Sequence, residues 1–124
     1  MKTVLIVEDS EACAETLQIA LEALADVKTV IVRSAAAALD TLEREGAAVV
    51  SALVTDLHMP KNNGFDLIRR LRAEARYARL PILMISGDSD PRLPQRALES
   101  GADAFFSKPY SPAAVRRKLE QLLC

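Results

Sequence analysis

The sequence has few cysteines, which could form disulfides, and few glycines and prolines, which interrupt helices and strands. Its two cysteines, Cys13 and Cys124, lie far apart and form no CxxC pair, which favours free thiols in a reducing compartment. Only four glycines and six prolines occur in 124 residues, and no stretch is of low complexity or reads as a linker. The length suits one domain and is too short for two, so we expect a single domain spanning residues 1–124.

Long hydrophobic runs and an excess of charge of one sign are also missing. The longest apolar runs, such as residues 4–7 and 82–85, are only a few residues long, whereas a membrane-spanning helix needs roughly 20. The N-terminal apolar stretch is too short for a signal peptide. Sixteen Lys and Arg residues against seventeen Asp and Glu leave a net charge of -1, which argues against general nucleic-acid binding. We therefore expect a cytoplasmic protein without membrane insertion or direct nucleic-acid contact.

What the sequence does contain is a regular alternation of two hydrophobic patterns. Short runs rich in β-branched residues are typical of strands buried on both faces, and they occupy residues 3–7, 29–32, 49–55, 82–85 and 104–107. After each run, apolar residues recur at the spacing of an amphipathic helix. Strand and helix thus alternate five times, which predicts an α/β fold with a parallel sheet between two layers of helices.

Capping residues predict where the helices begin and end. Serines precede three of the helical segments and are expected to be their N-caps: Ser10, Ser34 and Ser111. For the fourth helix we expect Asp90 to be the N-cap and Pro91 the first helical residue, with Pro94 still in the first turn. Gly46 and Gly101 are expected to end the second and fourth helices.

Polar residues gather at the carboxyl ends of the predicted strands. In an open parallel sheet the binding crevice lies beyond these ends, near the point where the strand order reverses. The residues found there are Glu8, Asp9, Asp56, Ser86 and Lys108. We therefore expect three carboxylates, a hydroxyl and an ammonium group to converge on one edge of the sheet.

This set of groups predicts a metal site that supports phosphoryl transfer. Three adjacent carboxylates repel one another unless a cation compensates them. Lys108 would offset one charge, and a divalent metal ion the rest. Oxygen ligands without imidazole or thiolate suit Mg²⁺. A carboxylate, Mg²⁺, a lysine and a hydroxyl are also the groups that phosphoryl transfer requires.

Four motifs at these strand ends together resemble the receiver domain of two-component response regulators. They are Glu8-Asp9, Asp56-Leu57-His58-Met59-Pro60 with Gly64, Ser86-Gly87, and Lys108-Pro109. The resemblance covers essentially the whole chain. It implies a flavodoxin-like (βα)5 three-layer sandwich whose five parallel strands lie in the order 2-1-3-4-5.

The resemblance assigns the phospho-acceptor and the metal ligands. Asp56 is implied to be the nucleophile that takes a phosphoryl group from a phosphohistidine of a sensor histidine kinase or phosphotransfer protein. Asp9 is implied to bind Mg²⁺ directly and Glu8 through water. Asp56 itself and the backbone carbonyl of His58 would complete the metal site. The domain would be no enzyme beyond its own phosphoryl transfer and slow autodephosphorylation.

The resemblance also implies which residues respond to the phosphoryl group. Ser86 would hydrogen-bond it and Lys108 would bind it, with a cis bond before the following proline directing the lysine into the site. Phe105 would be the switch aromatic, and plain core packing is the alternative for this residue. The side chains of His58 and Asp88 are expected to affect the lifetime of the phosphate.

A protein target is expected on the face formed by the fourth helix, the fifth strand and the fifth helix, through which the family signals. In this chain the face would comprise Arg92, Leu93, Gln95, Arg96, Glu99, Phe106, Tyr110, Arg116 and Arg117. Two departures from the family pattern stand out. Pro91 and Pro94 would stiffen the start of the fourth helix, and Asn63, which stands where the family more often has an acid, is expected to be a helix cap.

Two other functions fit parts of the pattern. A receiver-like scaffold would bind partners without phosphorylation, but it would not need the intact set of Asp9, Asp56 and Lys108. A haloacid dehalogenase-like phosphatase also uses an aspartyl nucleophile, yet it needs a second aspartate two residues later, where this chain has His58. The sequence leaves open whether the domain is free-standing or part of a longer regulator, and whether it is a monomer or a phosphorylation-dependent dimer.

Overall fold

The computed structural model describes residues 1–46, 48–59, 61 and 63–123, so Pro60 and Cys124, both considered above, lie outside the described residues. Strands and helices alternate as predicted. The elements are β1 (Lys2–Val7), α1 (Glu11–Glu22), β2 (Val27–Val32), α2 (Ala35–Glu45), β3 (Val50–Asp56), α3 (Gly64–Arg72), the short 3₁₀-helix η1 (Ala75–Tyr77), β4 (Ile82–Ser86), α4 (Leu93–Ser100), β5 (Ala104–Ser107) and α5 (Pro112–Leu123).

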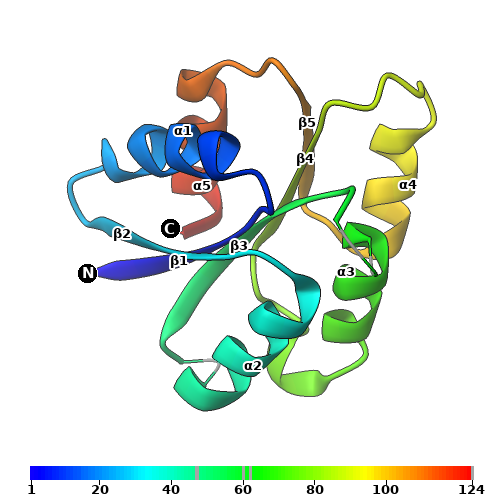
Figure 1. The fold of residues 1–124 in the computed structure, drawn as a ribbon. Helices are drawn as coiled ribbons and strands as arrows, with labels where there is room; N and C mark the ends of the chain where they lie inside the picture. The colour runs from blue at the N-terminus through cyan, green and yellow to red at the C-terminus, as the bar shows by residue number, and fades with distance from the viewer. Residues whose placement is uncertain (47, 60, 62, 124) are drawn as a thin grey trace.

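The five strands form one parallel sheet in the order β2-β1-β3-β4-β5, which confirms the predicted flavodoxin-like topology. Helices α1 and α5 cover one face of the sheet, and α2, α3 and α4 cover the other (Figure 1). The central strands β1, β3 and β4 carry apolar residues on both of their faces, and both faces are buried beneath helices. Within the described residues, no helix is long and apolar enough to cross a membrane.

The predicted capping is confirmed at most helix ends. The side chains of four N-cap residues each accept a hydrogen bond from the backbone N–H three residues later: Ser10, Ser34, Asn63 and Ser111. Gly46 and Gly101 end α2 and α4 with positive φ angles of 86° and 116°. These helix ends are therefore set by interactions between residues that are close together in the sequence.

The prediction for the start of α4 is wrong. The helix begins at Leu93, and Arg92, at the cap position, makes no side-chain capping bond. Asp90 instead forms a turn, because its carboxylate accepts the N–H of Arg92 at 2.9 Å and its backbone carbonyl accepts that of Leu93 at 3.2 Å. Pro94 is the second helical residue, where its missing N–H costs no intrahelical bond.

Four of the five strands differ from their predicted ranges by one or two residues. β1 begins one residue earlier, at Lys2, and β4 ends one residue later, at Ser86. β2 begins at Val27 instead of residue 29. β3 begins at Val50, which leaves Val49 exposed, and extends to Asp56. The difference at β3 matters for the site, because it places Asp56 on the sheet itself, paired in register with Ile85 of β4.

Candidate functional site

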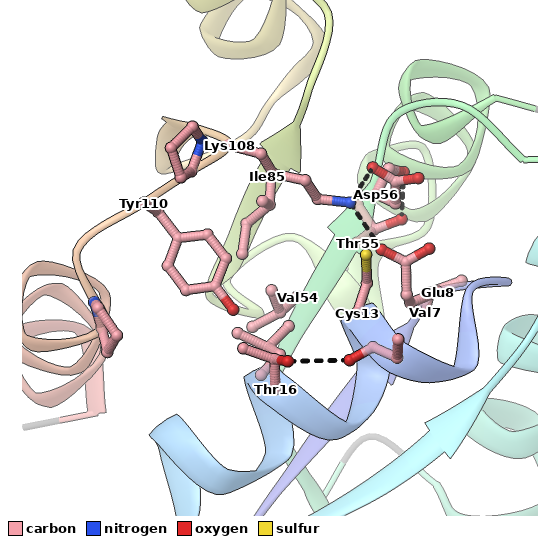
Figure 2. A pocket seen from close by; sticks show the side chains of 14 residues that line it. Val7, Glu8, Cys13, Thr16, Val54, Thr55, Asp56, Ile85, Lys108 and Tyr110 are labelled. Carbon is pink, nitrogen blue, oxygen red and sulfur yellow. Dashed lines mark hydrogen bonds and ion pairs between the residues drawn. The ribbon is translucent and has the colours of Figure 1, made fainter.

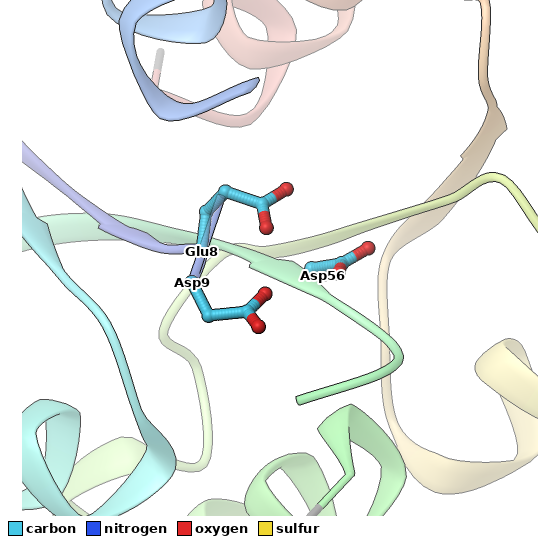
Figure 3. Close-up of side chains that lie close together, drawn as sticks. All are labelled: Glu8, Asp9 and Asp56. Carbon is cyan, nitrogen blue, oxygen red and sulfur yellow. The ribbon is translucent and has the colours of Figure 1, made fainter. Parts of the chain in front are cut away.

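Three carboxylates converge at the carboxyl edge of the sheet. Glu8 and Asp9 follow β1, and Asp56 ends β3, the neighbouring strand. One oxygen atom from each of the three side chains lies within 4.8 Å of the others (Figure 3). The chain leaves β1 toward β2 on one side and returns to β3 on the other, so this is where the strand order reverses. The three oxygen atoms form an acidic group that can hold a hard metal ion.

Lys108, the residue that directly follows β5, contacts this acidic group. Its Nζ donates a hydrogen bond to Glu8 Oε1 at 2.9 Å and to Asp56 Oδ1 at 3.4 Å (Figure 2). The side chains are mostly shielded from water, with 25% of Lys108 and 11% of Asp56 exposed. The Lys108–Pro109 peptide bond is cis, as predicted.

Burial and charge shift the protonation of this pair. Burial, and then the negative charge of Glu8, raise the pKa of Asp56 above its ordinary value of 3.8, although Lys108 acts in the opposite direction. Burial by itself would lower the pKa of Lys108, but the hydrogen bond to Glu8 and the charges of Asp56 and Glu8 raise it overall. Lys108 therefore stays protonated. Its positive charge does not fully offset burial and the charge of Glu8, so ionised Asp56 is unfavourable without a metal ion.

Ser86 lies at the same edge, but it is engaged elsewhere. It is the fully buried last residue of β4, and its hydroxyl accepts the N–H of Asp88 at 3.1 Å. Among the described residues, no hydrogen bond joins Ser86 to the acidic group. The bond to Asp88 uses only an acceptor position of the hydroxyl, so its O–H could still donate to a phosphoryl group on Asp56, as predicted.

A contact between His58 and Asp88 links two loops that follow strands at this edge of the sheet. His58 Nε2 lies 2.9 Å from Asp88 Oδ2, which joins the β3–α3 loop to the β4–α4 loop. The N–H of Asp90, and then His58, lower the pKa of Asp88. The sequence pointed to both side chains but not to their contact, because thirty residues separate them. The metal-binding role of the His58 carbonyl stays a prediction.

Phe105 is partly buried and packs against the core beneath α2, α3 and α4. This is the core-packing arrangement that the sequence left open. The role of Phe105 as a switch stays a prediction.

A cavity of about 300 Å³ opens beside the acidic group, between α1 and the β5–α5 connection (Figure 2). Cys13 and Thr16 of α1 line it together with Tyr110, and Cys13 is a free thiol. Burial raises the pKa of Tyr110. Sequence reasoning missed this cavity and placed Tyr110 on the predicted target face. The spacing of Cys13 and Thr16, three residues apart, puts them on one side of α1, but nothing local connects them to residue 110.

The predicted target face is smaller than the sequence suggested. Leu93 is buried in the core, so its assignment to this surface is wrong. Arg96 is exposed, but its guanidinium lies 4.8 Å from the centre of the Phe65 ring on the α3 side of the helix. Arg116 donates a hydrogen bond to the carbonyl of Ala20 in α1 at 3.3 Å.

Other predicted members of the target face fit an accessible surface. Arg92, Gln95, Glu99 and Arg117 are exposed, and Phe106 is partly buried. Leu98 was not assigned to this face, yet it is 51% exposed on α4. The helix buries Leu93 and Ala97, one turn apart, and Leu98 lies off that stripe.

Comparison with known proteins identifies the family. The model of the response regulator receiver domain matches residues 4–120. The chain belongs to this family.

Named relatives of this receiver domain include a chemotaxis protein CheY homolog from Campylobacter jejuni, 35% identical over 74 residues, which are 60% of this chain and 57% of the relative. The response regulator Rre1 from Synechocystis is 30% identical over 123 residues, 98% of this chain and 51% of that protein. The chain thus spans little more than half the length of these relatives. Among solved structures, the signal receiver domain of a histidine kinase from Syntrophus aciditrophicus superposes with a TM-score of 0.88 at 32% identity, covering 99% and 90% of the two chains.

Gly64 permits the close approach of α3 to Asp56, and replacing it with alanine is expected to destabilise the receiver domain. A Cβ atom at residue 64 would lie 2.6 Å from the backbone oxygen of Asp56 and 2.8 Å from the terminal methyl of Met84. The backbone oxygen cannot move aside without displacing β3. We expect Gly64→Ala to lower the free energy of unfolding by about 1–3 kcal/mol, measured by urea denaturation. Gly87→Ala is the matched control, because its Cβ would meet Lys108 only at an ordinary 3.8 Å; equal stability of the two variants would contradict the prediction.

Proposed function

We propose that Asp56 of this receiver domain accepts a phosphoryl group from a phosphohistidine donor in a Mg²⁺-dependent reaction. One observation carries the proposal: the Asp56 carboxylate lies in a group of three acids and accepts a hydrogen bond from Lys108. Three oxygen donors without nitrogen or sulfur suit Mg²⁺, with Glu8, Asp9 and Asp56 as the side chains that would hold it. The backbone carbonyl of His58 is the fourth proposed ligand.

The reaction is a substitution at phosphorus. A carboxylate oxygen of Asp56 forms a bond to the phosphorus atom while the bond from phosphorus to the donor's imidazole nitrogen breaks, which leaves an acyl phosphate and a free histidine. Lys108 neutralises oxygen charge on the transferred group as it moves. Bound Mg²⁺ would supply further charge neutralisation and hold the phosphoryl oxygens in place. The cavity beside Asp56 leaves room for the donor to approach.

Phosphorylation would act as a switch. The aspartyl phosphate adds about two negative charges and strong acceptor oxygens. We expect the Ser86 hydroxyl to turn toward these oxygens and Phe105 to repack, which changes the α4–β5–α5 surface that a protein target binds. The domain would not turn over an external substrate. It would act in the cytoplasm, as a monomer or as a dimer that forms on phosphorylation.

The test is to treat the protein with acetyl phosphate and Mg²⁺ and to measure its intact mass. We expect the mass to increase by one phosphoryl group when Mg²⁺ is present. If a chelator is added before acetyl phosphate, the mass should not change. Failure of acetyl phosphate and of histidine-kinase donors to label the protein would favour a phosphorylation-independent scaffold. Rapid repeated hydrolysis of small phosphate esters would favour a phosphatase.

The proposed target surface has its own test. Beryllofluoride with Mg²⁺ mimics the phosphoryl group without turning over, and a pull-down would compare treated with untreated protein. We expect a partner that binds the treated form preferentially. Partners that bind both forms equally would contradict a phosphorylation-controlled surface.

A further inference from the structure

A second pocket lies at the end of the sheet opposite the candidate site. It has a volume of about 320 Å³ and lies between the start of β3 and the connection from η1 to β4. Ser51, in its wall, is the second residue of β3 and Asp56 is the last, so a rise of about 3.3 Å per residue places them roughly 16–17 Å apart. Pockets that bind small molecules have volumes from about 300 Å³ upward. We call this one the β3-start pocket.

The described residues that line the β3-start pocket include two arginines and no carboxylate. Arg76 is held in place, because its guanidinium carbon lies 4.8 Å from the centre of the Tyr77 ring and its Nε donates to Glu74 Oε1 at 3.2 Å. Arg79 is exposed, and it forms no side-chain hydrogen bond or ion pair with any residue that the structure describes. The charge of Arg79 is therefore uncompensated, and the rim of the pocket is positively charged.

Buried apolar side chains form the inner wall of the pocket. Val50 is 3% exposed, Tyr77 1% and Leu80 8%. In the described part of the chain, the Tyr77 hydroxyl is the one buried side-chain polar atom without a hydrogen-bond partner. Buried hydroxyls are normally paired, so the protein itself does not fully satisfy the polar groups of this wall. The pocket thus combines a cationic rim with an apolar interior that contains an unpaired hydroxyl.

Ser51 lies at an irregularity of the sheet. Residues 3 and 4 of β1 pair with residues 50 and 52 of β3, so the register skips Ser51. Pairing of β3 with β4 begins only at Leu53, two residues further along. Such a bulge redirects a side chain relative to the regular pleat, and bulges are frequent beside binding sites. Within the described ranges, no hydrogen bond engages the Ser51 hydroxyl, which leaves it available to a ligand in the pocket.

We propose that the β3-start pocket binds a small phosphomonoester. Arg79, Arg76 and the Ser51 hydroxyl would hold its phosphate, and Tyr77 and Leu80 would contact its organic part. A phosphomonoester carries three terminal oxygens and about two negative charges, which suit two guanidinium groups and a hydroxyl better than the two oxygens of a carboxylate do. The inference is independent of the proposed phosphorylation of Asp56, which lies at the other end of β3.

The experiment follows nitrogen-15 NMR spectra of the full chain while phenyl phosphate or adenosine 5′-monophosphate is added without Mg²⁺. We expect saturable amide shifts at Ser51, Arg79 and Leu80, and none of comparable size at Glu8 or Asp56. Phenol and adenosine, which lack the phosphate, and inorganic phosphate, which lacks the organic part, are expected to bind at least about tenfold more weakly. Absence of saturable shifts with both esters, or equal binding of the phosphate-free compounds, would overturn the inference.

Variants separate a specific site from general attraction to positive charge. Arg79→Ala is expected to weaken binding of the esters at least about tenfold and to leave stability to urea unchanged, because this side chain has no bond to lose. Arg79→Lys keeps the charge without the guanidinium fork and should recover only part of the affinity. Ser51→Ala should weaken binding by a smaller factor. Arg117→Ala on α5 is the control, since it removes an exposed arginine from the helix layer on one face of the sheet, away from the pocket. Unchanged affinity in Arg79→Ala, or an equal loss in Arg117→Ala, would contradict the proposed site.

Discussion

Replacing Asp56 with asparagine is expected to abolish phosphoryl labelling and at the same time to stabilise the fold. The amide of asparagine lacks the anionic oxygen that attacks phosphorus, so acetyl phosphate should leave the protein's mass unchanged. The stabilisation follows from the site, where burial and the charge of Glu8 oppose ionisation of Asp56. A neutral side chain of the same shape avoids this penalty. The Asp56 carboxylate is thus an example of a functional group that the fold holds at a cost in stability.

The pH dependence of this effect has a definite sign. The pKa of Asp56 in the folded protein is raised above its ordinary value of 3.8. The contribution of this residue to stability is therefore fully present below about pH 3.8 and is lost as the pH rises through the raised pKa. The advantage of Asp56→Asn should be largest at neutral pH and should shrink as the pH falls through that range. Urea denaturation of both proteins at a series of pH values measures it.

Two controls make the Asp56 experiment specific. Asp26→Asn changes an exposed, distant acid and is expected to leave labelling intact. Added Mg²⁺ should reduce the stability advantage of Asp56→Asn, because a metal ion stabilises the wild-type acidic group and not the variant. Labelling that survives in Asp56→Asn would place the acceptor elsewhere. A variant less stable than the wild type at neutral pH would contradict the electrostatic argument.

Replacing Lys108 with methionine is expected to slow phosphoryl transfer strongly and yet to tighten Mg²⁺ binding. The ammonium group bonds Glu8, which is almost fully buried, and it also contacts Asp56. Its loss removes the charge that would compensate the transferred phosphoryl oxygens. It also removes a cation that repels the metal, and we expect Mg²⁺ affinity to rise about tenfold, equivalent to roughly 1.4 kcal/mol.

Stability should respond to the same substitution in a metal-dependent way. Without Mg²⁺, Lys108→Met leaves Glu8 and Asp56 without their cation and is expected to lower the free energy of unfolding by about 2 kcal/mol. With saturating Mg²⁺ most of this loss should be recovered. Calorimetric Mg²⁺ titration and urea denaturation measure the two effects, with the exposed Lys28→Met as the control. Weaker Mg²⁺ binding in Lys108→Met would show that the lysine supports the metal site instead of opposing it.

The sequence by itself determined the order of elements, most helix caps and the membership of the site. Strand runs without polar alternation identify a sheet buried on both faces, and serine caps act through bonds to backbone groups three residues away. In a parallel sheet all carboxyl ends meet at one edge, so Glu8, Asp56 and Lys108 could be grouped without knowing any distance. These features depend on local backbone chemistry and on a general rule of topology.

The tertiary structure decided what depends on how helices pack against that sheet. Asp90 was predicted to cap α4, but an aspartate satisfies the N–H two residues later in a turn with the same chemistry, and the packing of Leu93 into the core selects the later start. The pairing of His58 with Asp88 and the cavity wall formed by Cys13 and Tyr110 join residues far apart in the chain. No local pattern records such contacts, because they are fixed by the depth and angle at which separate elements meet.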